Sequence, residues 1–529
     1  MKNRKLSVLS SIACAIGALA AAPVRAQDEA PAPPGARLLP DRPDPREIPV
    51  PEIAASLPSL PGVDDLPVRK EMPDVLTMND GTKVTTAEQF KKRQKEMREI
   101  LEYYHVGRLP PAPGNTKGTV TQSEVVTISL PAIVPNPPET LKVRYRLIHL
   151  TFGPDEKLFL DVGILTPEGA GPVPAVIQPG GEPPGGPRLP TLAKGPMEGR
   201  GMDILLPPEI ALAGSGPARQ RGPGGGPSGA PGAGGPPGGR RAGRGGPGGP
   251  GGPPGGGFGG AATAESLARR VVQVLSHGYG YITFNTNDCA EDTTLRMPDG
   301  SFAFRTTRFF PAYPGYDWGI IGGWVWGTMR VVDYLQADPL VDKTKIIVTG
   351  TSRIGKAAMI SGAFDDRIAM VAPGASSGAG TPAYRHSGGA TTKQPSRGGK
   401  EGLTLMVMKY GNQFSPHLHQ FWGQVDKLPY DAHWFLALTA PRPFIMLEGT
   451  KDQNVVHNGI KQTWLAAQPA YALLGASDKL GVNWADRPHG FGDTDWDGLL
   501  SFADKNLLGK RVSRPFDLFP ADTEATANN

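Results

Sequence analysis

Residues 346–356 read IIVTGTSRIGK, and this stretch decides the fold. The β-branched run at 345–349 predicts a short buried strand, and 356–364 predicts a helix that follows the turn at once. Gly350 and Gly355 bracket Ser352 and provide space where a β-carbon would clash. A strand, a tight turn with a serine and a helix are the context of a nucleophile elbow. The spacing G-x-S-x-x-G is one residue longer than the usual G-x-S-x-G, so an ordinary strand–helix turn is the alternative.

The segments on either side of this stretch alternate between strand and helix patterns. Strand-like runs lie at 118–130, 142–150, 157–165, 175–178, 280–285 and 443–448, and helical patterns lie at 87–104, 264–276, 319–336 and 496–507. Such alternation predicts an α/β fold, with a mostly parallel central sheet and helices on both faces in a three-layer sandwich. One large domain fits this pattern better than several small ones.

A serine nucleophile needs a base, and the base needs a carboxylate that orients it. His489 lies in the loop 487–492, RPHGFG, directly before the last predicted helix. Asp452 follows the predicted strand 443–448. The order serine, acid, histidine is the one found in α/β-hydrolases. Either residue taken alone would equally suit a surface loop, so their joint occurrence in this order carries the prediction.

These motifs resemble a known family. The run GTSRIGK at 350–356 is similar to the G-C-S-R-x-G-K motif of glucuronoyl esterases, carbohydrate esterase family 15. The resemblance covers about residues 75–510 and includes the runs 362–369, 428–433, 440–443, 495–496 and 502–505. It implies an α/β-hydrolase fold and metal-free, cofactor-free hydrolysis of the ester between the 4-O-methyl-glucuronic acid of plant cell-wall xylan and lignin alcohols.

The resemblance also implies roles for single residues. Ser352 would be the nucleophile and His489 the base, while Arg353 would help to hold the oxyanion and Lys356 would bind sugar hydroxyls or the uronate. A solvated start of a helix is the plainer explanation for Arg353 and Lys356. Cations at a helix N-terminus oppose the helix dipole, which favours a functional reason.

The sequence departs from the family at two positions. The family often places its acid in a P-x-E-S-G context after the elbow helix, where Ala375 stands here, so we assign the acid role to Asp452. A tryptophan usually found beyond the later acid is replaced by Gln453 and Asn454. An acetyl-xylan esterase or general carboxylesterase, and a catalytically silent polysaccharide-binding protein, therefore stay open as alternatives.

The net charge of +5 and the pI near 9 come from two segments of the 529-residue chain. Residues 1–26 contain four basic residues and 214–260 contain five, and neither segment contains an acid. The rest carries 46 basic and 50 acidic residues, a net charge of −4. Charge therefore gives no indication of a nucleic-acid partner. We expect a monomer that acts on glucuronoxylan or a small uronate ester.

The same two segments suggest how the chain is organised. Residues 1–26 have a basic start, an apolar stretch and small residues near Ala26, which predicts a cleaved signal peptide and a secreted or periplasmic protein; a transmembrane anchor is the alternative. Residues 27–74 are rich in Pro and Ala and predict an N-terminal arm, and 75–529 would form the catalytic domain. Of residues 214–260, 34 are Gly or Pro, which predicts a disordered insertion in that domain.

Two patterns could indicate metal binding. The run Asp493-x-Asp495-x-Asp497-Gly498, with Asp504 in the twelfth place, has the spacing of an EF-hand calcium loop. The prolines and glycines before it deny it an entering helix, so capping of the last helix is the preferred explanation. The pair at 417 and 419, two histidines, has no third ligand nearby. We therefore predict no metal site.

Overall fold

The computed structural model describes residues 59–129, 140–181, 183, 264–295, 301–387 and 401–521. The signal peptide predicted at 1–26, most of the arm predicted at 27–74 and the insertion predicted at 214–260 lie outside these residues. All the described residues belong to one structural unit. None of its helices combines the length and the apolar character that crossing a membrane requires.

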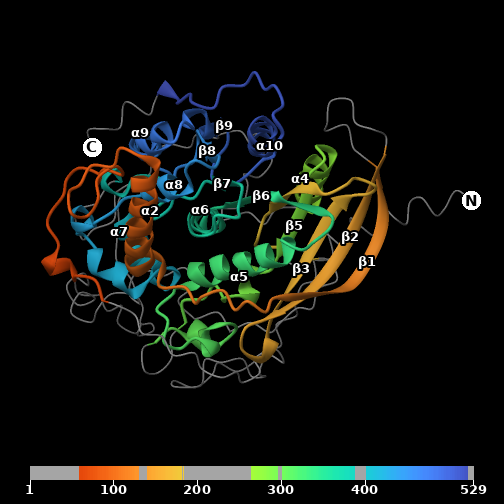
Figure 1. Cartoon of the computed structure of the whole chain (residues 1–529), viewed down its shortest axis with the longest axis horizontal. Helices are drawn as coiled ribbons and strands as arrows, with labels where there is room; N and C mark the ends of the chain where they lie inside the picture. Colours follow the sequence, from red (N-terminus) through yellow and green to blue (C-terminus); the bar gives the residue numbers. More distant parts are fainter. Residues whose placement is uncertain are drawn as a thin grey trace, which may run out of the picture. The chain divides into compact units, whose positions relative to one another are not determined.

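A nine-stranded sheet forms the centre of the fold (Figure 1). Its strand order is β1-β2-β3-β5-β4-β6-β7-β8-β9. The first three strands run antiparallel to their neighbours, and the six from β5 to β9 run parallel. The bounds are β1 Lys117–Ser129, β2 Thr140–Phe152, β3 Leu158–Pro167, β4 Val173–Ile177, β5 Gly280–Phe284, β6 Val341–Thr351, β7 Met370–Gly374, β8 Phe444–Gly449 and β9 Leu480–Ala485.

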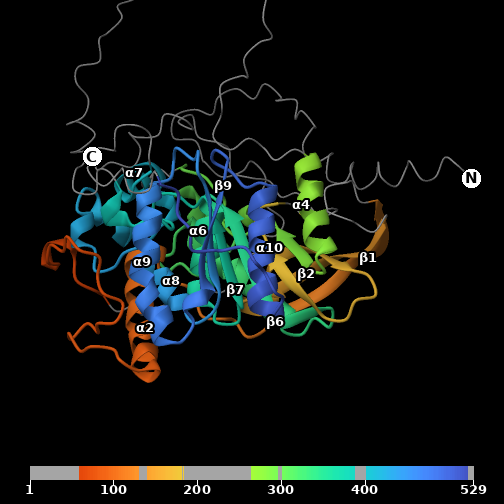
Figure 2. The ribbon, with the colours of Figure 1, turned by 90° about the horizontal axis from the view of Figure 1, so that it is seen from above.

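Helices pack on both faces of this sheet, which confirms the predicted three-layer α/β fold (Figure 2). One face is covered by α4 (Ala264–Ser276) and α10 (Asp493–Leu508), against alternate strand residues such as Ile347 and Ile445. The other face packs against α2 (Ala87–Leu101), α5 (Ile320–Leu335), α6 (Arg353–Phe364), α8 (His433–Thr439) and α9 (His457–Leu473). The short helix α7 (Leu403–Tyr410) joins the same core. The period of two along each strand explains why the two faces contain different side chains.

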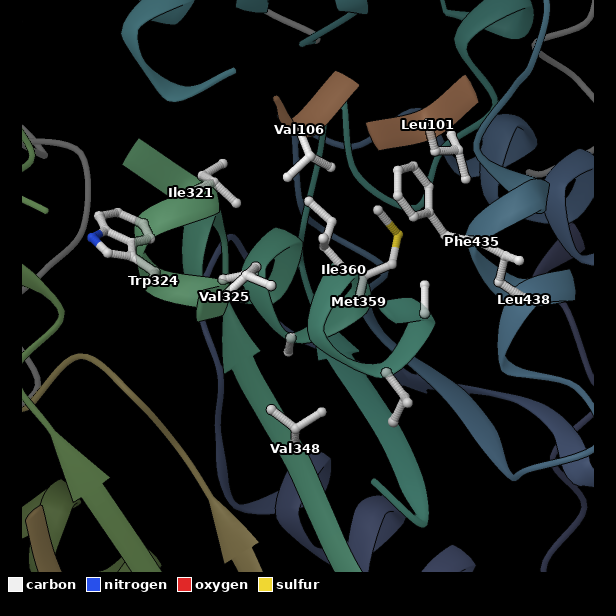
Figure 3. Close-up of a cluster of buried hydrophobic side chains, with 14 of the residues drawn as sticks. Leu101, Val106, Ile321, Trp324, Val325, Val348, Met359, Ile360, Phe435 and Leu438 are labelled. Carbon is white, nitrogen blue, oxygen red and sulfur yellow. The ribbon is translucent and has the colours of Figure 1, made fainter. Parts of the chain in front are cut away.

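The core beneath the elbow helix α6 is tightly filled (Figure 3). Met359 and Ile360 of α6 are fully buried among Phe435 of α8, Val325 of α5 and Val106, which lies in the π-helical turn Glu102–Val106 after α2. Burial of a large aliphatic side chain contributes about 1.5–3 kcal/mol. The α6 helix is therefore held rigidly, and so is the turn from which it begins.

The first described segment lies along the folded body. The Tyr104 hydroxyl donates to Pro61 O at 2.6 Å, and the backbone N–H of Arg69 donates to Asp426 O at 2.6 Å. The Pro73 carbonyl accepts from the side chains of His433 and Trp434. Residues 59–74 therefore contact the domain that was predicted to begin at residue 75.

The predicted elements agree with the observed ones to within a few residues, with three instructive differences. The helix predicted at 87–104 ends at Leu101 and continues as the π-helical turn. The helix predicted at 356–364 begins at Arg353, directly after the serine. Sequence patterns missed β7, β9 and the helices α7, α8 and α9.

Candidate active site

Ser352 stands between β6 and α6 in a sharply bent conformation. Its φ of 58° and ψ of −125° are unusual for a residue with a β-carbon. Its backbone N–H donates to Gly374 O at 3.0 Å, which ties the turn to the end of β7. A β-carbon at Gly350 would lie 2.8 Å from the backbone of Ile354, and one at Gly355 would lie 2.7 Å from Gly374 O. Both glycines are therefore required by close packing, as expected for an elbow.

Asp452 and His489 form a directly bonded pair. The Nδ1 atom of His489 lies 2.8 Å from Oδ2 of Asp452. The carboxylate is fully buried, whereas the imidazole is 22% exposed. The other carboxylate oxygen accepts the backbone N–H of Asn454 at 2.9 Å. A histidine that donates Nδ1–H to a carboxylate keeps Nε2 free to accept a proton.

Parallel strands bring these residues to one edge of the sheet. Ser352, Asp452 and His489 follow β6, β8 and β9, and all three strands run in the same direction. The loop that carries His489 also reaches the serine turn, because a β-carbon at Gly374 would lie 2.6 Å from the ring of Phe491. Gly374 is the residue whose carbonyl holds the N–H of Ser352. The turn of Ser352 and the loop of His489 therefore both reach the carboxyl end of β7, and Asp452 is joined to this loop through its bond to His489.

Arg353 begins α6, and its side chain is 43% exposed. Its guanidinium forms an ion pair with Asp292, in the segment after β5. The backbone N–H of Asp292 in turn bonds to Asn287 Oδ1 at 3.0 Å. Arg353 is thus anchored to the neighbouring loop while it remains next to Ser352.

Lys356 lies one helical turn after Ser352 and is 1% exposed. Its Nζ atom lies 3.4 Å from Ser377 Oγ. Burial lowers the pKa of Lys356 to about 8, while the nearby Glu401 carboxylate acts to raise it and the Arg353 charge to lower it. Lys356 is therefore a buried cation on the first turn of α6.

Sequence patterns missed two members of this site. Glu401 accepts a hydrogen bond from Ser377 Oγ, and its backbone N–H donates to Asn454 O at 3.0 Å. Gly180, after β4, lies against the elbow, since a β-carbon there would be 3.5 Å from Ile354. The sequence indicates only Gly180, because Pro179 and two glycines directly follow the predicted strand 175–178.

Ala375, Gln453 and Asn454 stand at the positions where the sequence departs from the family. Ala375 is fully buried with a φ of 42°, and its N–H donates to Leu447 O at 2.9 Å. Gln453 is exposed, and Asn454 is half-buried. Asp452 is therefore the carboxylate that contacts His489, while Ala375 contributes backbone only.

The acidic run at 493–504 is helical. Asp495 accepts the N–H of Gly492 at 2.8 Å and pairs with Arg487, so it caps α10 as the sequence suggests. Asp497 pairs with Arg514 and Asp504 with Lys510. Within the described ranges, no group of three or more His, Cys, Asp or Glu side chains has a metal-binding arrangement.

The chain matches known proteins in sequence. Residues 264–475 match the family model described as glucuronyl esterase, fungi. A 4-O-methyl-glucuronoyl methylesterase from Phanerochaete carnosa is 34% identical over 197 residues, which are 36% of this chain and 48% of that protein. Another from Hypocrea jecorina is 31% identical over 257 residues, 47% of this chain and 52% of that protein. The chain spans about half the length of the curated relatives that it matches.

Solved structures agree on the fold. The glucuronoyl esterase catalytic domain from Hypocrea jecorina superimposes with a TM-score of 0.56 at 24% identity, covering 86% of this chain and 93% of that one. A glucuronoyl esterase mutant from Sporotrichum thermophile, in complex with methyl 4-O-methyl-β-D-glucopyranuronate, gives 0.55 at 19% identity, covering 87% and 95%. The α/β-hydrolase fold and the resemblance to glucuronoyl esterases are therefore confirmed.

Proposed function

We propose that this chain, which resembles glucuronoyl esterases in sequence and fold, is a serine esterase that hydrolyses 4-O-methyl-glucuronoyl esters of plant xylan. The observation that carries the proposal is the elbow serine, Ser352, at the same sheet edge as the bonded pair of Asp452 and His489. Names of relatives that match about a third to a half of this chain support the same substrate class.

The reaction begins with attack by Ser352 Oγ on the ester carbonyl while His489 Nε2 takes the hydroxyl proton. His489 then gives this proton to the departing alcohol, which leaves an acyl-enzyme. A water molecule, deprotonated by the same imidazole, attacks the acyl group. The bond to Ser352 Oγ breaks, the imidazolium returns the proton to this oxygen, and the uronic acid is released. Asp452 holds the Nδ1–H tautomer and stabilises the imidazolium that forms in both steps.

The tetrahedral oxyanion is stabilised from the start of α6. The first N–H groups of a helix have no acceptor within the helix, and the positive end of the dipole favours negative charge there. Arg353 directly follows the serine, and its guanidinium, held by Asp292, adds positive charge on this side of the site.

Lys356 and Glu401 recognise the sugar. The ammonium donates hydrogen bonds to hydroxyl or uronate oxygens of the sugar, and the carboxylate of Glu401 accepts hydrogen bonds from sugar hydroxyls. Both groups are linked through Ser377, so they present a donor and an acceptor at one place.

The predicted organisation of the chain belongs to the same proposal. The protein is exported after cleavage near Ala26, acts as a monomer without a cofactor, and carries an insertion at 214–260 within its catalytic domain. Edman sequencing of the secreted protein tests the cleavage site, because an intact Met1 would contradict export by this signal.

Purified protein offered benzyl glucuronate, methyl galacturonate and 4-nitrophenyl acetate, beside a Ser352→Ala variant, tests the function. We expect turnover of the glucuronate ester, and loss of that turnover by at least about 10³-fold in the variant. Turnover of acetate alone would indicate a general or acetyl-xylan esterase. If no ester is turned over while glucuronoxylan still binds, the chain is a polysaccharide-binding protein and the proposal is wrong.

A further inference from the structure

The loop after β7 has an unusual backbone at Ser377. The residue is fully buried and has a φ of 51°, a conformation that glycine adopts freely and other residues adopt at a cost. Its neighbours Ala375 and Ala379 also have positive φ values, of 42° and 59°. Residues held in such conformations cluster at functional sites, where surrounding structure enforces them.

The Ser377 hydroxyl bonds to two charged side chains from other parts of the chain. Its proton is donated to Glu401 Oε2, and its oxygen lies 3.4 Å from Lys356 Nζ. Within the described part of the chain, Ser377 is the hydrogen-bond partner of this ammonium. The hydroxyl therefore bridges a cation from α6 and a carboxylate that precedes α7.

Backbone packing keeps this bridge in place. A β-carbon at Gly378 would lie 2.5 Å from Glu401 O, so the two backbones are in direct contact. The N–H of Glu401 donates to Asn454 O, and the N–H of Asn454 donates to Asp452 Oδ1. A chain of hydrogen bonds thus joins Ser377 to the carboxylate that orients His489.

We propose that Ser377 is a positioning residue for substrate recognition: its hydroxyl separates the Lys356 ammonium from the Glu401 carboxylate and aims both at adjacent hydroxyls of the uronate sugar. This inference rests on the proposed esterase function. In a buried site of low dielectric constant, opposite charges attract strongly, and without the intervening hydroxyl they move into contact and satisfy each other. A contact pair has fewer free donors and acceptors for a sugar.

Two variants separate the effect of losing the Ser377 hydroxyl from the effect of its backbone conformation. Ser377→Ala removes the hydroxyl and keeps the β-carbon, whereas Ser377→Gly removes the hydroxyl and also fits the positive φ. We expect KM for benzyl glucuronate to rise about tenfold or more in both variants, as for the loss of a hydrogen bond to a charged group, with little change in kcat. Hydrolysis of a simple acyl ester that lacks sugar hydroxyls should change less than twofold.

A second measurement does not depend on turnover. Protonated Lys356 donates a charge-assisted hydrogen bond to the hydroxyl and neutral Lys356 only a weaker one, and the pKa of this lysine is lowered to about 8. The loss of Tm in Ser377→Ala, relative to wild type, should therefore be larger at pH 7 than at pH 10. A role in packing alone predicts the same loss at both pH values.

The outcomes are distinguishable. If wild-type protein turns over no glucuronate ester, the proposed function is wrong, and the pH dependence of Tm still decides whether Ser377 bridges the charges. If wild type is active and KM is unchanged in both variants, the inference about Ser377 is wrong while the proposed function stands. A Tm difference that does not vary with pH also overturns it.

Discussion

At the scale of single residues, the site depends on contacts that chain order only partly reveals. Ser352 and Asp452 could be predicted because each follows a strand pattern, and His489 because it precedes the last helix and completes the residue order of a hydrolase. Ser377 and Glu401 could not, because their importance comes from lying beside Lys356 in the folded chain. The pairing of Arg353 with Asp292 is equally invisible in the sequence, since the two are 61 positions apart, with α5 and β6 between them.

Replacement of Asp452 by asparagine should lower kcat by about three to four orders of magnitude. An amide at this position favours the tautomer of His489 that cannot accept the serine proton, while the buried shape is kept. Steady-state rates on benzyl glucuronate measure the effect. Asp486→Asn is the matched control, because that carboxylate is exposed and pairs with Lys451. Near-full activity of Asp452→Asn would show that another residue orients the base.

Glu448 lies four residues before Asp452 and is fully buried. Burial, reinforced by the charge of Asp452, raises its pKa from 4.5 to about 8, and Thr381 donates to its Oε1 at 3.0 Å. Between pH 4.5 and about 8 the folded protein keeps this proton and the unfolded chain releases it, so this group makes stability fall as pH rises.

Glu448→Gln should therefore raise Tm relative to wild type, and the gain should grow from pH 5 to pH 8. The expected gain in the free energy of unfolding at pH 8 is on the order of several kcal/mol. Thermal unfolding at both pH values measures it, with Glu99→Gln, at an exposed position of α2, as the control. An equal Tm difference at pH 5 and pH 8 would contradict the assignment.

At the scale of elements, segments with a clear pattern were predicted well, and segments without one were missed whatever their length. The strands β1 to β3 and the helices α5 and α10 have clear periodicity. The strand β7 has five residues, two of which are Pro373 and Gly374, and β9 buries the polar Asn483. The helix α9 contains Pro469. These elements form because neighbouring strands and helices cover them, and tertiary packing of this kind leaves little trace in local composition.

The elbow itself provides a prediction at this scale. Gly355→Ala places a methyl group 2.7 Å from Gly374 O, which forces α6 away from β7. We expect a loss of about 2–4 kcal/mol in the free energy of unfolding and of most activity. Urea titration measures the first quantity. Gly171→Ala, where a β-carbon meets no atom within 4 Å, should change neither.

At the scale of the whole molecule, the described body is one α/β unit, and loops from distant parts of the sequence meet at the carboxyl ends of its parallel strands. The fold class could be predicted because strands and helices alternate along most of the chain. The surface that residues 59–74 contact could not be predicted, because a Pro-rich segment has no periodicity that reveals which side chains it covers.

A chain that begins at residue 75 should be less stable than one that begins at residue 59. The shorter chain loses the hydrogen bonds to Pro61, Arg69 and Pro73 and exposes the aromatic side chains behind them. With a net value of about 1 kcal/mol for each hydrogen bond, we expect a loss of at least about 3 kcal/mol. Differential scanning calorimetry of the two chains compares them, and equal Tm values would mean that the segment only rests on the surface.

This docking has a consequence for how the protein is made. The partners of Val63 and Pro73 lie 357 to 361 residues later in the chain, at Gln420, His433 and Trp434. A ribosome adding about 5–20 residues per second needs tens of seconds to reach them. Throughout that time residues 63–73 emerge without their final neighbours, so helical segments made much later, including α8, complete the surface that these residues bind.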